Sequence, residues 1–165
     1  MLDPELEAAA EALLALARRH RLRLGTAESC TGGLIAGALT AIGGSSDVVE
    51  GGLVTYSNEA KTALLGVPAD LFGQVGAVSD EVASAMAAGV LSRLDRVDLA
   101  VSVTGIAGPG GGTAAKPVGL VHFGLARRGS APETSHMIFP GDRSAIRRAT
   151  VLRAFALLTT AINGN

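Results

Sequence analysis

The stretch Thr26-Ala27-Glu28-Ser29-Cys30-Thr31-Gly32-Gly33 joins a predicted strand to a predicted helix and places a serine at the junction. Residues 22–24 alternate between apolar and charged, as in a half-buried strand, and 34–39 have the small apolar side chains of a packed helix. Unpaired N–H groups at the start of a helix carry partial positive charge, so they can stabilise an oxyanion formed beside Ser29. Helix capping by Ser29 or Thr31 is the alternative, and this stretch alone leaves both roles open.

The segments around this junction alternate between strand and helix patterns. Strands are predicted over 22–27, 52–56, 99–103, 118–127 and 133–139. Helices are predicted over 4–20, 32–41, the segment from Asn58 through Lys61, 79–94 and 142–162. The last two strands flank a short turn that suits an antiparallel hairpin. This order predicts an α/β fold, a three-layer α/β/α sandwich with a mixed, mostly parallel sheet, as one domain over residues 1–165.

Composition excludes several classes of function. The 165 residues carry a net charge of −1 and are only 3% aromatic, so neither a basic surface nor many stacking rings are available to nucleic acid. No apolar run is long enough to cross a membrane, and the acidic start Met1-Leu2-Asp3-Pro4-Glu5 differs from a signal peptide. We expect a cytoplasmic protein that binds neither nucleic acid nor a membrane. A small domain this rich in apolar residues also favours a homo-oligomer, and we expect a dimer formed through a helix face.

The single cysteine and the three histidines limit the cofactor chemistry. Cys30 has no partner for a disulfide, and His20, His122 and His136 lack the spacing of metal ligands, so we expect neither a metal nor a cofactor. Cys30 is an alternative nucleophile to Ser29, but a cysteine nucleophile needs a histidine base, and no histidine lies at the carboxyl end of a predicted strand. Ser29 is therefore the preferred nucleophile, and Cys30 a small buried residue.

Three polar segments follow the carboxyl ends of predicted strands, which is where ligands bind in α/β sheets. The first strand leads to Ser29, the second to Tyr56 ahead of Lys61, and the third to Thr104 and a glycine-rich loop. Lys61 lies one turn into its helix, where the helix dipole favours a neutral amine that can take a proton from Ser29, and burial of the side chain, if it occurs, acts in the same direction. An exposed lysine on a helix face is the alternative, because no S-x-x-K motif joins the pair.

The loop Thr104-Gly105-Ile106-Ala107-Gly108-Pro109-Gly110-Gly111-Gly112 matches neither a Walker loop nor a dinucleotide fingerprint. Its glycines allow backbone N–H groups to surround an anion, and Lys116 adds a cation, which together favour a phosphate or carboxylate ligand. A flexible surface loop is the alternative. Arg143 and Arg147 open the last helix four residues apart on one face, either as an anion clamp or as exposed residues.

Four motifs follow one another along the chain in the order found in one family. They are Ala27-Glu28-Ser29-Cys30-Thr31-Gly32-Gly33, Gly52-Leu53-Val54-Thr55-Tyr56-Ser57 with Lys61, Thr104-Gly105-Ile106-Ala107-Gly108-Pro109, and Lys116-Pro117-Val118-Gly119. Over residues 5–162 the chain resembles the CinA C-terminal domain family, also called the PncC family, of nicotinamide-nucleotide amidohydrolases. Gly43-Gly44 stand where that family often has Pro-Gly. The sequence also has no counterpart of the N-terminal domain of full-length CinA proteins, whose activity we do not expect here.

The resemblance implies hydrolysis of the carboxamide of nicotinamide mononucleotide to nicotinic acid mononucleotide and ammonia, in pyridine-nucleotide recycling. It assigns Ser29 as the nucleophile, Lys61 as its general base, and Tyr56 and Thr104 as supporting polar residues. Substrate contacts are expected from the Ser29 turn, the glycine loop and two cations: Glu28, Cys30, Thr31, Gly32, Gly33, Gly105, Gly108, Gly110, Gly111, Lys116 and Arg143. The alternative is a non-catalytic nucleotide-binding or interaction domain of a competence/damage-inducible protein. A phosphatase is a third hypothesis, but the sequence offers no metal cluster or carboxylate pair for it.

Overall fold

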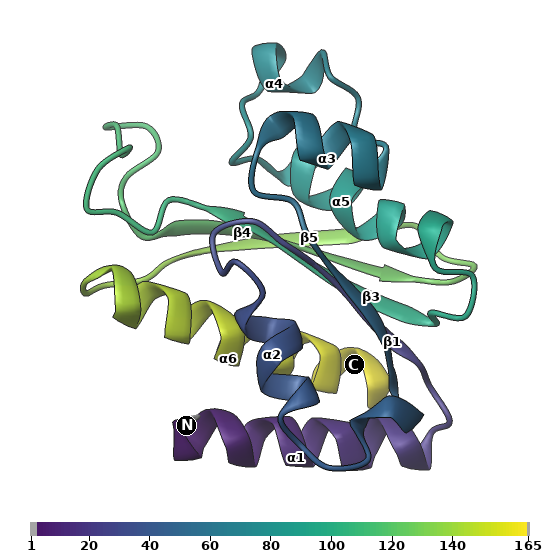
Figure 1. Ribbon diagram of the computed structural model, residues 1–165. Coiled ribbons are helices and arrows are strands. Elements are labelled where there is room, and N and C mark those ends of the chain that lie inside the picture. Colours follow the sequence, from purple (N-terminus) through teal and green to yellow (C-terminus); the bar gives the residue numbers. More distant parts are fainter. Residues whose placement is uncertain (1–2, 165) are drawn as a thin grey trace.

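A five-stranded mixed sheet forms the centre of the computed structural model, which describes residues 3–164 (Figure 1). The strands are β1 (Leu24–Glu28), β2 (Val49–Val54), β3 (Leu99–Gly105), β4 (Leu120–Arg127) and β5 (Glu133–Ile138). They are ordered β2-β1-β3-β4-β5. β1 pairs in parallel with both β2 and β3, whereas β3–β4 and β4–β5 are antiparallel. The three parallel strands therefore end at one edge of the sheet, where ligand sites form in α/β folds.

Helices cover both faces of the sheet, as the alternation of elements predicts (Figure 1). The described helices are α1 (Pro4–Arg19), α2 (Leu34–Thr40), η1 (Ser45–Asp47), α3 (Asn58–Leu65), α4 (Leu71–Gln74), α5 (Asp80–Arg93) and α6 (Arg143–Ile162). Figure 1 shows α3, α4 and α5 on one face and α2 and α6 on the other, with α1 beneath α6. None of the described helices has both the length and the apolar character that a membrane crossing requires.

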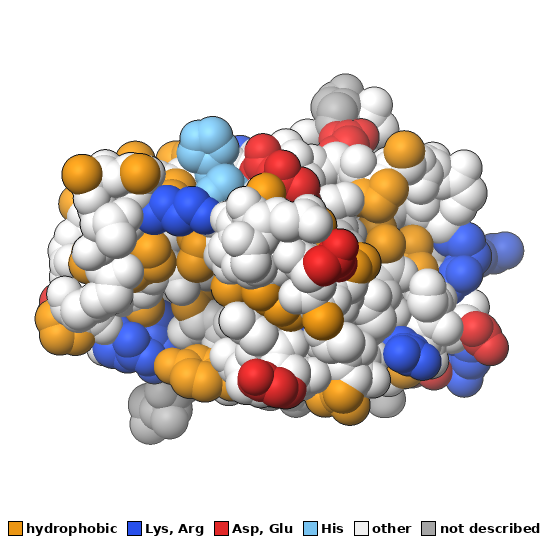
Figure 2. Space-filling view, turned by 90° about the horizontal axis from the view of Figure 1, so that it is seen from above, with side chains coloured by type: hydrophobic (Ala, Val, Ile, Leu, Met, Phe, Trp, Pro, Cys, Tyr) orange, Lys and Arg blue, Asp and Glu red, His pale blue; other side chains and the backbone are white. Residues whose placement is uncertain are grey.

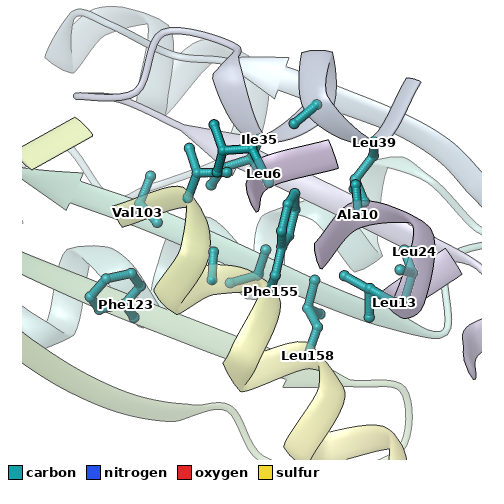
Figure 3. Close-up of a cluster of buried hydrophobic side chains, with 14 of the residues drawn as sticks. Leu6, Ala10, Leu13, Leu24, Ile35, Leu39, Val103, Phe123, Phe155 and Leu158 are labelled. Atoms are coloured by element: carbon teal, nitrogen blue, oxygen red, sulfur yellow. The ribbon is translucent and has the colours of Figure 1, made fainter. Parts of the chain in front are cut away.

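Two apolar clusters hold these layers together. The larger joins α1, α2 and α6 to one face of the sheet, and the smaller joins α5 to the other. Figure 3 shows Phe155 of α6 between labelled side chains of α1 and α2. Phe155 and Phe123 are buried among aliphatic side chains, as expected for a chain with so few aromatic residues. Burial of this apolar surface is the main force that fixes the helices on the sheet.

The predicted starts of α1, α3, α5 and α6 agree with the structure because they rest on local capping chemistry, whereas α2 begins at Leu34, after Gly33 and without a side-chain cap. The side chains of Asp3, Ser57, Ser79 and Asp142 each accept a backbone N–H in the first turn of α1, α3, α5 and α6. The bounds of β2 differ from the prediction. β2 begins at Val49 and ends before Tyr56, because its register with β1, which pairs Glu28 with Val54, sets its length. The short α4 and η1 were not predicted.

Candidate active site

The turn after β1 presents Ser29 at the carboxyl edge of the sheet. The Ser29 N–H donates to the Val103 carbonyl of β3, and the Ser29 carbonyl accepts from Gly32, so the turn is held at both ends. Gly32 and Gly33 have φ values of 59° and 101°, a left-handed conformation that side chains with a Cβ rarely adopt. The Gly-Gly pair therefore lets the chain turn sharply from β1 into α2 while Ser29 stays at the edge.

The Glu28 side chain holds this turn in place through hydrogen bonds and does not face a substrate. Its carboxylate, only 1% exposed, accepts hydrogen bonds from the Thr31 hydroxyl and from the backbone N–H groups of Gly33, Ile35 and Ala36, at 2.6–3.0 Å. These N–H groups lie at the start of α2 and have no partner within that helix. The prediction of Glu28 as a substrate contact is therefore corrected: its oxygen atoms are occupied, and it fixes the position of the Ser29 turn.

Lys61 reaches Ser29 from the next element along the chain. Its Nζ lies 3.0 Å from the Ser29 Oγ, and its side chain is 1% exposed. Ser57 caps α3, which places Lys61 one turn into the helix and directs it toward the sheet edge. Desolvation lowers the pKa of the Lys61 ammonium below its usual range, and the structure offers no carboxylate within salt-bridge distance of it among residues 3–164. A neutral amine hydrogen-bonded to a serine hydroxyl can accept its proton.

Two backbone N–H groups in the turn after Ser29 lack a partner among residues 3–164, and both belong to buried residues. Within residues 3–164, the N–H groups of Cys30 and Thr31 donate to no other residue, whereas those of Gly32 and Gly33 are already paired. Of the N–H groups of residues 30–32 that we expect to stabilise an oxyanion, only those of Cys30 and Thr31 are therefore unpaired among residues 3–164. The Cys30 and Thr31 carbonyls accept from the Arg147 guanidinium at 3.2 and 3.0 Å. The Cys30 carbonyl and the Thr31 N–H belong to one peptide group, so Arg147 of α6 holds the Thr31 N–H in place, whereas the peptide group of the Cys30 N–H is held through the Ser29 carbonyl by Gly32.

The Cys30 thiol is not placed as a nucleophile. Its side chain is buried in the larger apolar cluster, and this burial raises its pKa to about 11. A thiol with so high a pKa is almost fully protonated near neutral pH and is a poor nucleophile. This environment supports the preference for Ser29, although Cys30 contributes its backbone to the turn.

Tyr56, Arg143 and the glycine loop that Arg143 contacts form a group that we call the rim. Tyr56 is 63% exposed, and its hydroxyl accepts from Arg143 at 3.1 Å. The same guanidinium donates to the Gly108 carbonyl at 2.8 Å. Arg143 is the first residue of α6, whose beginning lies on the same side of the molecule as the loop between β3 and β4 (Figure 1). Arg143 therefore joins two of the three segments that the sequence placed at this edge.

Other predicted contacts have structural partners. The buried Thr104 hydroxyl donates to the Ala77 carbonyl at 2.8 Å, so it anchors the segment before α5. The Lys116 ammonium donates to the Val75 and Val78 carbonyls at 2.6 and 2.7 Å. In the structure the ammonium therefore holds that same segment, and the contact of Lys116 with a phosphate stays a prediction.

The glycines of the loop divide into two groups. A Cβ on Gly105 or Gly108 would lie 2.7 or 2.6 Å from a valine side chain, so these two serve close packing. Gly110 has open space where a side chain would stand, and Gly111 has only one atom nearby, 3.7 Å away. Only Gly110 and Gly111 therefore keep the accessible backbone expected of anion-binding residues.

Comparisons with known proteins agree with this arrangement. The model of the CinA C-terminal domain matches residues 6–162. A CinA-like protein of Mycolicibacterium vanbaalenii is 54% identical over 141 residues, which are 86% of this chain and 33% of that protein. The chain thus spans about a third of the length of the curated relatives it matches.

Solved structures share the whole architecture. The competence/damage inducible protein CihA of Agrobacterium tumefaciens superposes with a TM-score of 0.93 at 47% identity, over 99% of this chain and 98% of that one. A competence or damage-inducible protein of Enterobacter asburiae gives 0.88 at 34% identity, over 95% and 98%. With its fold and nearly its full length matched, this chain belongs to the CinA C-terminal domain family.

Proposed function

We propose that this protein hydrolyses the carboxamide of nicotinamide mononucleotide to nicotinic acid mononucleotide and ammonia. The observation that carries the proposal is the buried hydrogen bond between Lys61 Nζ and Ser29 Oγ. A pure binding site has no need of a serine paired with a desolvated lysine, whereas acyl transfer requires a nucleophile together with its base. The choice of nicotinamide mononucleotide as the substrate rests on the resemblance of the four motifs to the family.

The first half-reaction forms an ester on Ser29. The hydroxyl oxygen attacks the carboxamide carbon while neutral Lys61 takes the hydroxyl proton. The carbonyl oxygen of the substrate becomes an oxyanion, which the free N–H groups of Cys30 and Thr31 stabilise. Collapse of this intermediate breaks the C–N bond, and the Lys61 ammonium returns its proton to the departing nitrogen, so that ammonia leaves and the amine is neutral again.

The second half-reaction releases the acid. Water attacks the ester carbon, Lys61 again takes the proton, and the same two N–H groups stabilise the second oxyanion. Cleavage of the ester bond returns the proton to Ser29 and frees nicotinic acid mononucleotide. No step calls on the Cys30 thiol, in keeping with its burial and raised pKa.

The nucleotide part of the substrate is assigned to the rim. Arg143 is a cation at the mouth of the site, and the open backbone of Gly110 and Gly111 lies in the loop that this arginine contacts. Arginine and backbone N–H groups suit the oxygen atoms of a phosphate. Binding energy from this remote group orients the carboxamide, so free nicotinamide should be a poor substrate.

The decisive experiment incubates the purified protein with nicotinamide mononucleotide, without added metal, and follows ammonia and nicotinic acid mononucleotide. Ser29→Ala is assayed in parallel, with Ser130→Ala, an exposed serine in the turn between β4 and β5, as the matched control. Product from wild type and the control but not from Ser29→Ala supports the proposal. Binding of the mononucleotide without product would instead make the protein a nucleotide-binding domain, and release of phosphate would make it a phosphatase.

A further inference from the structure

Three metal-ligating side chains from three elements meet away from the Ser29 site. Asp80 is the first residue of α5, His122 lies on β4, and His136 lies on β5. His122 and His136 are direct partners in the antiparallel register, so their side chains stand on the same face of the sheet. Their ring centroids are 5.2 Å apart, and His122 Nδ1 lies 2.6 Å from Asp80 Oδ1. One ligand atom from each of the three residues lies within 4.8 Å of the other two.

The cluster opens to solvent. His122 and Asp80 line a shallow pocket, together with Glu81 and Lys116, that contains neither Ser29 nor Lys61. Figure 2 shows histidine side chains beside carboxylates on the face of the molecule that carries α3, α4 and α5. A metal ion can therefore reach the cluster directly from solution.

We propose that Asp80, His122 and His136 bind a divalent transition-metal ion of the Zn²⁺ type. Imidazole nitrogen and carboxylate oxygen are its ordinary ligands, and three protein ligands leave a fourth position for water or a bound group. Ligand atoms around a tetrahedral ion lie about 3.4 Å apart, given metal–ligand distances near 2.1 Å. The widest of the present separations, up to 4.8 Å, must therefore close by about an ångström or more, and the exposed side chain of His136 on the edge strand is free to rotate toward the other two.

The local charges suit a cation. Asp80 and Glu81 bring two carboxylates to the pocket, and the one ammonium that lines it, that of Lys116, is turned toward the Val75 and Val78 carbonyls. The contact between His122 and Asp80 already orients two of the ligands before an ion arrives. Preorganisation of this kind lowers the cost of ordering the side chains on binding.

Bound metal would connect the start of α5 to the edge of the sheet. The edge strand β5 pairs with β4 alone, and α5 begins directly after the segment that Thr104 and Lys116 anchor. An ion shared by α5, β4 and β5 binds the folded chain and not the unfolded one, so it must raise the thermal stability of the protein.

The test titrates the metal-free protein with Co²⁺ near pH 7.5, follows the d–d absorption of the bound ion, and then displaces Co²⁺ with Zn²⁺. Wild type should bind one equivalent, and Zn²⁺ should raise its Tm. His136→Asn, on the exposed edge strand, should weaken binding by at least about tenfold and abolish the rise in Tm. His20→Asn, an exposed histidine at the end of α1, is the matched control and should behave as wild type.

Ser29→Ala separates this site from the catalytic one, because it should bind Co²⁺ as wild type does whether or not the proposed hydrolysis is correct. Failure of wild type to bind one equivalent would overturn the proposal. So would a loss of less than tenfold in His136→Asn, or an equal loss in His20→Asn.

Discussion

Lys61 Nζ and Ser29 Oγ lie 3.0 Å apart inside the protein although 32 residues separate them along the chain. The parallel pairing of β1 with β2 accounts for this contact. Parallel neighbours end at the same edge of the sheet, so the turn after β1 and the helix after β2 begin side by side. The serine and the lysine therefore meet through topology, with no local motif that contains both.

The two adjacent nucleophile candidates should differ sharply in the amidase assay. Ser29→Ala should lower kcat by at least about 10³-fold, because no other group can form the ester. Cys30→Ala should keep near-normal turnover, and the native thiol should resist alkylation at pH 8 until the protein is unfolded, since its pKa is about 11. The converse result, an inactive Cys30→Ala with an active Ser29→Ala, would identify the cysteine as the nucleophile.

The rate should depend on the protonation of Lys61. Only the neutral amine accepts the Ser29 proton, so kcat should fall about tenfold for each pH unit below the pKa of Lys61. Lys61→Arg keeps a positive charge but cannot lose it near neutral pH, and it should be inactive across the whole pH range. Full activity of Lys61→Arg would remove the lysine from the mechanism.

Burial of Lys61 should also appear in the stability of the protein. Its pKa is lowered in the folded state, so between that pKa and 10.5 the unfolded chain binds more protons, and the free energy of unfolding must rise with pH in this window. Lys61→Met should remove this pH slope and should stabilise the protein at pH 7, because the buried amine no longer has to be desolvated. Urea unfolding at several pH values measures both effects, and a slope that persists in Lys61→Met would contradict the assignment.

Glu28→Gln should destabilise the protein although it removes only a charge. The amide nitrogen of glutamine would face N–H donors at the start of α2, so at least one hydrogen bond to a charged acceptor is lost and the others weaken. We expect a loss of about 3 kcal/mol in the free energy of unfolding. Glu59→Gln, an exposed residue in the first turn of α3, is the control and should change stability little.

Arg147 should act on turnover through the Ser29 turn. Arg147→Met frees the Cys30 and Thr31 carbonyls, so the peptide group that carries the Thr31 N–H loses its fixed orientation, and kcat should fall about tenfold or more with KM nearly unchanged. Its neighbour Arg148 pairs with Asp3 and Glu5 on α1, so Arg148→Met should leave kcat intact. A change confined to KM, or equal effects in the two variants, would argue against a positioning role for Arg147.

Arg143 should act on substrate binding. Arg143→Met should raise KM for nicotinamide mononucleotide about tenfold, the loss of one good charged contact, while leaving the slow hydrolysis of free nicotinamide unchanged. Steady-state kinetics with the two substrates measure this difference. An equal loss on both substrates would show that Arg143 does not recognise the phosphate.

The prediction from sequence was most successful where structure depends on neighbours along the chain. Caps such as Ser57 and Ser79, the hairpin around residues 128–130, and the junction at Ser29 all rest on local chemistry, and the structure has each of them. The extent of β2 was misjudged because its pairing partner β1, and not its own composition, sets its ends.

Side chains that act across the fold were assigned less well. Glu28 and Lys116 have types and positions that suit a ligand, yet both are occupied by backbone groups of neighbouring segments. The sequence suggests an anion clamp or an exposed residue for Arg147, whereas the structure shows its guanidinium bonded to the Cys30 and Thr31 carbonyls. His122 and His136 lack metal-ligand spacing along the chain, and the register of one hairpin brings their rings together.

Local patterns in the sequence are enough to predict the order of the elements, the mixed α/β architecture and the residues that stand at the carboxyl edge of the sheet. The spacing of apolar residues, helix capping and turn chemistry each involve only a few neighbouring residues, so they can be recognised without knowledge of the fold. Which polar atoms lack a protein partner at this edge follows from the three-dimensional packing: among residues 3–164 the N–H groups of Cys30 and Thr31 donate to no other residue, and the Lys61 amine is paired with Ser29 alone. Hydrogen bonds from distant segments occupy the rest, because a buried polar group takes whichever partner the packing brings within reach.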